Sequence, residues 1–272
     1  MNISADIHTH TNFSDGKCSP REMLLSAIGK GLDVYGFSDH AHMKIASHWM
    51  MAGERTDNYI KEINSLKAEF SDWIKALCGI EHDVFSDIAL APFDYVIGSV
   101  HYIKCGNVFC PVDATKNDVL YAIQKYFGGD PYAYCGEYYS LLARHAENPE
   151  VDVVGHFDLV EKFNDDGSVF DRTSPKYIKP AVDAMEKLNA AGKIFEINTG
   201  AMFRVGRSVP YPSEYLLRTL NEMHGKIVFS SDAHSTDAIA FAFDRASALA
   251  EKCGFSDFDR TFFLKEKRGV SS

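Results

Sequence analysis

Residues 6–16 read DIHTHTNFSDG, a short apolar run that ends in two histidines one residue apart. Side chains at positions i and i+2 of a β-strand point to the same side, so His8 and His10 converge at the end of a strand. The loop that follows carries Asp15. Such a histidine pair either binds a metal ion or is a chance surface pair, and the rest of the chain distinguishes the two interpretations.

Short apolar runs of this kind recur along the chain. Most are continuously apolar, as expected for strands that are buried on both faces of a sheet. We predict strands over residues 3–8, 32–38, 74–81, 94–101, 151–156, 192–198 and 225–232. Amphipathic segments with short loops separate them, which indicates a parallel sheet. Seven such strands in 272 residues predict one β/α barrel domain over residues 1–272, one unit short of eight.

The helical segments carry their own start and stop signals. The segment 19–31 has Ser19 as N-cap, Pro20 at the first helical position and a glycine at its end, which predicts a helix. A second Ser-Pro start opens the helix predicted over 173–192, where we expect Pro180 to cause a kink. We expect two helices within 115–148, and a small strand over 260–269 that covers one end of the barrel.

Composition excludes several classes of protein. Apolar residues make up 46% of the chain, which supports a large core, and the net charge is −10. A negative protein is not attracted to a phosphate polyanion, so we expect no nucleic-acid partner. No apolar run approaches the roughly 20 residues of a membrane span, and no signal peptide is evident. We read the six cysteines as reduced thiols and expect a cytoplasmic enzyme or binding protein.

Polar residues stand at the ends of the predicted strands. They are His8 and His10, His40, Glu81, His101, His156, Glu196 and Asn198, and Asp232 with His234. In a β/α barrel all these ends face one rim, where active sites lie. Each residue alone has an ordinary explanation, such as a hydrogen-bonded strand-end histidine or a helix N-cap. Together, imidazoles and carboxylates form the donor set of zinc, manganese or iron and predict a metal centre.

The other histidines lie away from the strand ends. His145 and His224 read as solvated helix residues. His42 and His48 occupy the long loop after the second strand and could approach the rim, but we assign them no role.

The motifs at the strand ends resemble those of the PHP (polymerase and histidinol phosphatase) superfamily, in the same order along nearly the whole chain. They are HTHTNFSDG, GFSDH, GIE, GSVH, VVGHFDLV and SSDAH. The resemblance implies a distorted (β/α)7 barrel with two or three divalent metal ions. Residues 195–213, FEINTGAMFRVGRSVPYPS, are similar to a segment of the stand-alone histidinol-phosphate phosphatases.

The resemblance also implies a ligand set, residue by residue. One ion is expected at His8, His10, Glu81 and Asp232; a second at Glu81, His101 and His156; and a third at Asp15, His40 and His234. One branch of the superfamily has a histidine where Asp15 stands, but a carboxylate also ligates. The implied attacking group is a metal-bridging hydroxide held by Glu81 and Asp232.

Three cations follow the rim strands and suit a phosphate ester. Arg204 and Arg207 can clasp phosphate in a bidentate manner, and Lys162 can act as a point charge. For Lys162 and Arg207 a solvated loop position is an equal alternative.

The resemblance implies hydrolysis of the small molecule L-histidinol phosphate, in histidine biosynthesis. One alternative is a PHP phosphoesterase acting on nucleotides or short oligonucleotides, although the basic stripe and stacking platform for single strands are not evident. Another is a metal-stabilised binding subunit without activity. The sequence leaves the oligomeric state open.

Overall fold

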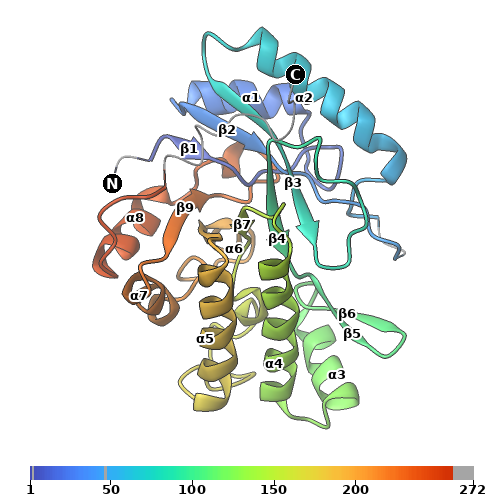
Figure 1. Cartoon of the computed structure of the whole chain (residues 1–272), viewed down its shortest axis with the longest axis vertical. Helices are drawn as coiled ribbons and strands as arrows, with labels where there is room; N and C mark the ends of the chain where they lie inside the picture. The colour runs from blue at the N-terminus through green and yellow to red at the C-terminus, as the bar shows by residue number, and fades with distance from the viewer. Residues whose placement is uncertain (2, 46–47, 260–272) are drawn as a thin grey trace.

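The computed structural model describes residues 1, 3–45 and 48–259. Seven parallel strands form one sheet in the order β1-β2-β3-β4-β7-β8-β9. Their bounds are Ala5–Asp6 (β1), Val34–Phe37 (β2), Lys75–Asp83 (β3), Tyr95–Ser99 (β4), Val153–Val154 (β7), Ile194–Asn198 (β8) and Lys226–Ser230 (β9). Just beyond β1 and β9, a parallel bridge between Thr9 and Ala233 joins the two edges of the sheet. The sheet is therefore a nearly closed seven-stranded barrel, which confirms the predicted fold class (Figure 1).

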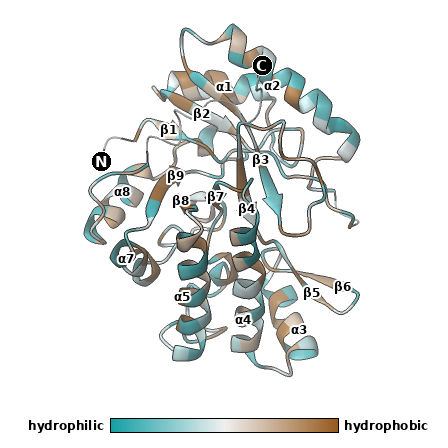
Figure 2. Cartoon of the chain, in the orientation of Figure 1, coloured by the Kyte–Doolittle hydropathy of each residue, from teal (hydrophilic) through white to brown (hydrophobic). Residues whose placement is uncertain are grey.

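Helices cover the outside of this barrel. They are α1 (Pro20–Gly29), α2 (Thr56–Glu69), α3 (Lys116–Tyr126), α4 (Pro131–Leu142), α5 (Pro175–Ala190), α6 (Gly200–Arg204), α7 (Glu214–Glu222) and α8 (Phe243–Lys252). In Figure 2 these helices mix hydrophilic and hydrophobic residues, as expected for helices with one face on the sheet and one in solvent. None of the helices in the described ranges is long and apolar enough to cross a membrane.

The predicted capping signals act as expected in α1. The Ser19 side chain accepts a hydrogen bond from the backbone N–H of Glu22, and the Glu22 side chain accepts one from the backbone of Ser19. Gly31 has a φ of +76° just after the helix, a conformation that glycine adopts without strain. In α5 the helix continues through Pro180.

Tyr95 fills the barrel interior between the first four strands. Its hydroxyl donates to the carbonyl oxygens of Ile7, at 2.5 Å, and Phe37, at 3.1 Å. A Cβ atom at Gly36 or Gly79 would lie 2.3 Å or 2.2 Å from atoms of the Tyr95 side chain. These two glycines therefore leave the space that the tyrosine ring occupies, and any larger residue would displace it.

A β-hairpin leaves the barrel directly after β4 and was absent from the predicted elements. It consists of β5 (Tyr102–Cys105) and β6 (Val108–Pro111), paired antiparallel. Gly106, with a φ of +64°, permits the two-residue turn between them. The Gly-Asn pair between two alternating segments is the signal that could have predicted this hairpin.

The two histidines predicted to be solvated, His145 and His224, have different outcomes. His145 is not solvated: it lies in a short 3₁₀ helix, η2 (Ala143–Glu147), is 3% exposed, and its Nε2 lies 3.0 Å from the Ser99 carbonyl oxygen. It is buried because it packs against Gly98, where no side chain intervenes. His224 is exposed, as predicted, but it lies two residues after the end of α7 and not within a helix. The strand predicted over 260–269 lies outside the described residues.

Candidate metal centre and active site

The histidine pair that follows β1 faces the inside of the barrel mouth. His8 and His10 are fully buried, with ring centroids 5.1 Å apart. The His8 Nε2 lies 3.4 Å from Glu81 Oε2, and the His10 Nε2 lies 3.2 Å from Asp232 Oδ1. The first strand and the last therefore bring their polar ends to one point, as the strand spacing predicts.

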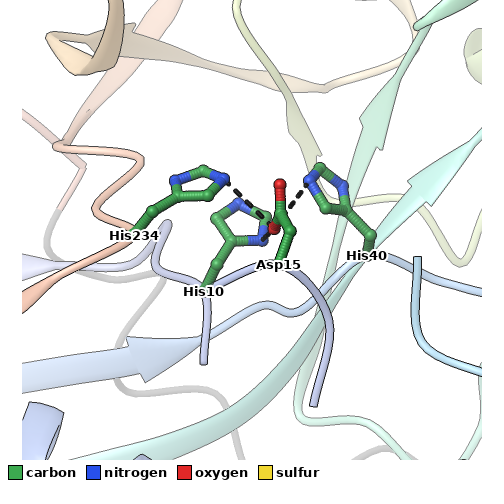
Figure 3. A group of neighbouring side chains, drawn as sticks. All are labelled: His10, Asp15, His40 and His234. Carbon is green, nitrogen blue, oxygen red and sulfur yellow. Dashed lines mark ion pairs between the residues drawn. The ribbon is translucent and has the colours of Figure 1, made fainter. Parts of the chain in front are cut away.

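Three groups of side chains have ligand atoms within 4.8 Å of one another, close enough to hold a metal ion. They are His10, Asp15, His40 and His234; His8, His10 and Asp232; and His40, Glu81 and His101. Figure 3 shows the first group around Asp15, whose Oδ1 lies 3.2 Å from His234 Nε2 and 3.5 Å from His40 Nε2. His156 lies beside them, with its Nε2 2.9 Å from Glu81 Oε1.

All nine predicted ligands thus lie at one rim. The grouping differs from the one that the resemblance implied, because His10 adjoins the Asp15 group and His40 also faces Glu81. Ligation by each residue stays a prediction.

Glu81, on β3, occupies the centre of the cluster. Its Oε1 faces His101 at 3.3 Å and His156, while its Oε2 faces His40 at 2.6 Å and His8. Burial would raise the pKa of Glu81, but the charges of the surrounding histidines hold it well below its usual value. An ionised carboxylate with its two oxygens turned to two sets of imidazoles is suited to bridge two metal ions.

Several buried polar atoms in this cluster make no well-aligned hydrogen bond, although imidazole or carboxylate atoms lie close to some of them. They are His8 Nε2, both ring nitrogens of His10, His156 Nδ1 and Glu81 Oε2. Buried polar atoms are rarely left unsatisfied, so this set calls for a partner, and neutral imidazoles with carboxylates suit a divalent transition metal. Burial, together with the charges of His40 and His234, lowers the pKa of His10 well below its usual value and keeps it in the neutral form that ligates. The residues present therefore fit several metal ions.

Further carboxylates hold the predicted ligands in place from behind. Glu196, on β8, accepts a hydrogen bond from His8 Nδ1 at 2.8 Å and another from Ser230 Oγ at 2.7 Å. Asp83 lies 3.2 Å from His101 Nδ1 and accepts from the His101 backbone N–H at 2.6 Å. Such partners fix the tautomer and the orientation of a metal-binding histidine.

The supporting residues were only partly visible in the sequence. Glu196 stands at a strand end, where we grouped it with the rim residues, but the structure places it behind His8. Asp83 was missed, although it lies two residues after Glu81 and therefore on the same face of β3. Asp39 was also missed; it directly precedes His40, and it accepts hydrogen bonds from Thr11 and Ser14 that shape the first loop.

Arg204 ends α6 and faces Asp232. Its two terminal nitrogens donate to the two carboxylate oxygens of Asp232, at 3.0 Å and 2.8 Å. Burial would raise the pKa of Asp232, but Arg204 and His8 hold it well below its usual range. Gly200 allows this approach, since a Cβ there would lie 2.7 Å from the Asp232 Cβ. Arg204 is thus placed beside the predicted ligands by a bidentate ion pair.

A cavity of about 270 Å³ opens over the metal-binding cluster. One part of its lining, here called the ligand wall, consists of Asp15, His40, His101, His156, Asp232 and His234, with Arg204 beside them. The rest of the lining, here called the hairpin wall, consists of residues that sequence analysis missed, apart from Lys162: Trp49, Tyr102, Pro111, Asp113, Ala114 and Leu159. Trp49 stacks on Tyr102 at an interplanar angle of 17° and donates from Nε1 to its hydroxyl at 3.0 Å.

Arg207 is not at this cavity, which corrects the expectation that it contacts substrate. It is 3% exposed, and its Nη1 donates to the Glu161 carbonyl oxygen at 2.8 Å. Its guanidinium also lies 4.5 Å from the centroid of the Tyr211 ring. The side chain thus joins two loops behind the cavity, a partnership that neighbouring sequence cannot reveal.

Comparison with known proteins agrees with this geometry. A family model of the PHP domain matches residues 6–200. The chain belongs to the PHP domain family. This confirms the family resemblance of the strand-end motifs, and the matched range includes seven of the nine predicted ligands.

Individual relatives extend over most of this PHP chain. A histidinol-phosphatase of Lactococcus lactis is 28% identical over 266 residues, covering 93% of this chain and 92% of the relative. A crystal structure from Listeria monocytogenes, 20% identical, has a TM-score of 0.78 and covers 89% of this chain and 99% of that one. The histidinol phosphate phosphatase of L. lactis, complexed with zinc, L-histidinol and phosphate, is 24% identical with a TM-score of 0.71, covering 94% and 96%. These structures share the barrel fold.

Proposed function

We propose that this protein is a metal-dependent phosphomonoesterase that hydrolyses L-histidinol phosphate to L-histidinol and phosphate. The observation that carries the proposal is the cluster of nine imidazole and carboxylate side chains at the floor of a cavity that Arg204 and Lys162 also line. Two relatives that match more than 90% of this chain are histidinol-phosphatases. We further propose that residues 1–272 form one phosphatase domain acting in the cytoplasm.

The clusters would hold two or three divalent ions, with zinc, manganese and iron as candidates. His8, His10, Glu81 and Asp232 lie around one position, and Asp15, His40 and His234 around another. Such ions, when bound, polarise phosphoryl oxygens and lower the pKa of coordinated water.

The other residues of the cavity then bind and orient the ester. Arg204, held by Asp232, can turn its guanidinium to the phosphoryl oxygens, and Lys162 adds a positive charge from the hairpin wall. The stacked Trp49 and Tyr102 offer a flat apolar surface to the imidazole of the leaving alcohol. These contacts bind both ends of the ester within one cavity.

A substrate panel tests the proposal. The purified protein, with zinc or manganese added, is assayed with L-histidinol phosphate, nucleoside monophosphates, short oligonucleotides and sugar phosphates. We expect the highest kcat/KM for L-histidinol phosphate and loss of activity after chelation, with recovery on metal addition. A clear preference for a nucleotide would favour the alternative phosphoesterase, and no hydrolysis of any ester would favour a binding subunit.

A further inference from the structure

Asp113 places a carboxylate in the cavity that no metal cluster uses. Three aspartates line the cavity: Asp15, Asp113 and Asp232. Asp15 and Asp232 belong to groups that could hold a metal ion, whereas Asp113 joins none of the groups found among the described residues. It follows the β5–β6 hairpin and lines the hairpin wall of the cavity, and its side chain is 30% exposed. Asp113 therefore lies outside the proposed set of metal ligands.

The Asp113 carboxylate is only partly neutralised. Lys162 Nζ donates to its backbone carbonyl oxygen at 2.8 Å and to Oδ2 at 3.1 Å. Over residues 1, 3–45 and 48–259, the other oxygen, Oδ1, accepts no hydrogen bond. Burial would raise the pKa of Asp113, but Lys162 and His101 lower it, which keeps the group ionised at neutral pH. One negatively charged oxygen in the cavity lining thus remains available to a ligand.

We propose that Asp113 binds an ammonium group on the alcohol half of the substrate and so selects phosphate monoesters of amino alcohols. This inference rests on the proposed function and extends it to the substrate class. With the phosphoryl group beside Arg204, the alcohol half would meet the rest of the cavity lining, which includes Trp49, Tyr102 and Asp113. An anion there attracts a cationic alcohol and repels one that bears a second anion.

A merely structural role makes a different prediction. If Asp113 serves only to orient Lys162, its loss should reduce the hydrolysis of every phosphate monoester equally, because Lys162 faces the phosphoryl group. If it binds an ammonium group, the loss should be confined to substrates that carry one. Two substrates that differ only in the amine separate these roles.

The experiment compares kcat/KM for L-histidinol phosphate and for the phosphate ester of 3-(imidazol-4-yl)propan-1-ol, which lacks the amine. Asp113→Asn should reduce kcat/KM about 10- to 100-fold for the first and less than about threefold for the second, the range for one charge-assisted hydrogen bond. Asp113→Glu keeps the charge and should retain most of the preference. Lys162→Met should affect both esters alike.

A matched control removes a carboxylate from a surface lysine pair. Asp166 is 63% exposed and lies 3.3 Å from Lys116 Nζ, so Asp166→Asn should leave both values unchanged. Equal losses for the two esters in Asp113→Asn, or no loss, would overturn the inference. Calorimetric titration with L-histidinol gives a second measurement, in which Asp113→Asn should bind at least tenfold more weakly.

Failure of the proposed function has a separate signature. In that case the wild-type protein does not prefer L-histidinol phosphate over the other esters of the panel. The comparison is then made with 2-aminoethyl phosphate and propyl phosphate. An unchanged ratio between wild type and Asp113→Asn for this pair would overturn the inference, whereas a selective loss for the amine would support it.

Discussion

The two walls of the cavity differ in how they are built. The ligand wall comes mostly from strand ends, and the deepest residues of its cluster, His8, His10, Glu81 and Asp232, are 4% exposed or less; carboxylates such as Glu196 support them from behind. The hairpin wall comes from a loop, the β5–β6 hairpin and the segment after β7. Its residues Trp49, Tyr102, Asp113 and Lys162 are only partly buried.

From this difference we infer that the ligand wall serves metal binding and the hairpin wall serves the choice of substrate. Shifting a parallel strand by one residue turns its side chains to the other face, so the ligand wall is determined by the same register that builds the barrel. The hairpin wall makes no such contribution to the sheet and can change without disturbing the strands. We therefore expect changes in the ligand wall to abolish metal binding, and changes in the hairpin wall to alter the choice of substrate.

The largest effect is expected at Glu81. Glu81→Ala should remove the carboxylate that faces two sets of imidazoles and leave the protein with about one metal ion in place of two or three. Loss of the Lewis acids should reduce kcat/KM by a factor on the order of 10³ or more. His40→Ala should mainly affect the Asp15 group.

Elemental analysis with kinetics checks this, and Glu222→Ala, at an exposed helix end, is the control. Full metal content in Glu81→Ala, or fewer than one ion in wild type with no gain on metal addition, would contradict the bridging role.

Arg204→Ala should have the next largest effect. A lost charge-assisted contact in a partly dry site is worth about 2–4 kcal/mol, which is roughly 30- to 1,000-fold in kcat/KM. Arg204→Lys should recover only part of this, because lysine lacks the bidentate fork. Metal content should not change. Wild-type kinetics in Arg204→Ala would contradict a substrate contact, and loss of metal would show that the arginine acts by holding Asp232.

Glu196→Gln tests the support behind the ligand wall. A glutamine keeps the shape but removes the charge that orients His8, and loss of such a partner typically reduces metal affinity about 10- to 100-fold. Competition with a chelator of known affinity measures the change. An affinity equal to that of wild type would mean that the barrel alone positions His8.

The smallest effect is expected at His145, which packs against the end of β4, just before the β5–β6 hairpin. Its ring contacts the Ser99 carbonyl at the end of β4, and burial lowers its pKa from about 6.5 to about 4. Between these values the unfolded chain binds a proton there and the folded protein does not, so stability is lost as the pH falls from about 6.5 to 4.

Chemical denaturation of His145→Gln at pH 7.5 and pH 5.5 measures this contribution. The free energy of unfolding of the variant should fall by about 1.3 kcal/mol less than that of wild type between the two pH values. An identical fall in both proteins would show that His145 does not titrate in this range.

The sequence could predict the ligand wall because of a geometric rule. Parallel strands have a single direction, so the residues that follow each buried run meet at one rim whatever their distance along the chain. His8 and Asp232 are an example: the apolar run before each is enough to bring them together. No equivalent rule exists for the hairpin wall. Trp49 and Asp113 lie in loops, and the sequence pattern does not predict where these loops run in the fold.

What the sequence by itself determined is therefore the barrel, the rim and the side chains that gather at the rim, since periodicity and strand ends are local properties. Only the tertiary structure decided the surroundings of several side chains: Glu196 lies behind His8, Arg207 donates to the Glu161 carbonyl oxygen instead of lining the cavity, and His145 lies in the core. Each of these depends on a partner from a distant segment, where burial makes an unpaired polar group costly and a hydrogen-bonded one stable. The local sequence shows that a residue is polar. Only the folded barrel shows which distant group that residue contacts, and this contact determines its role.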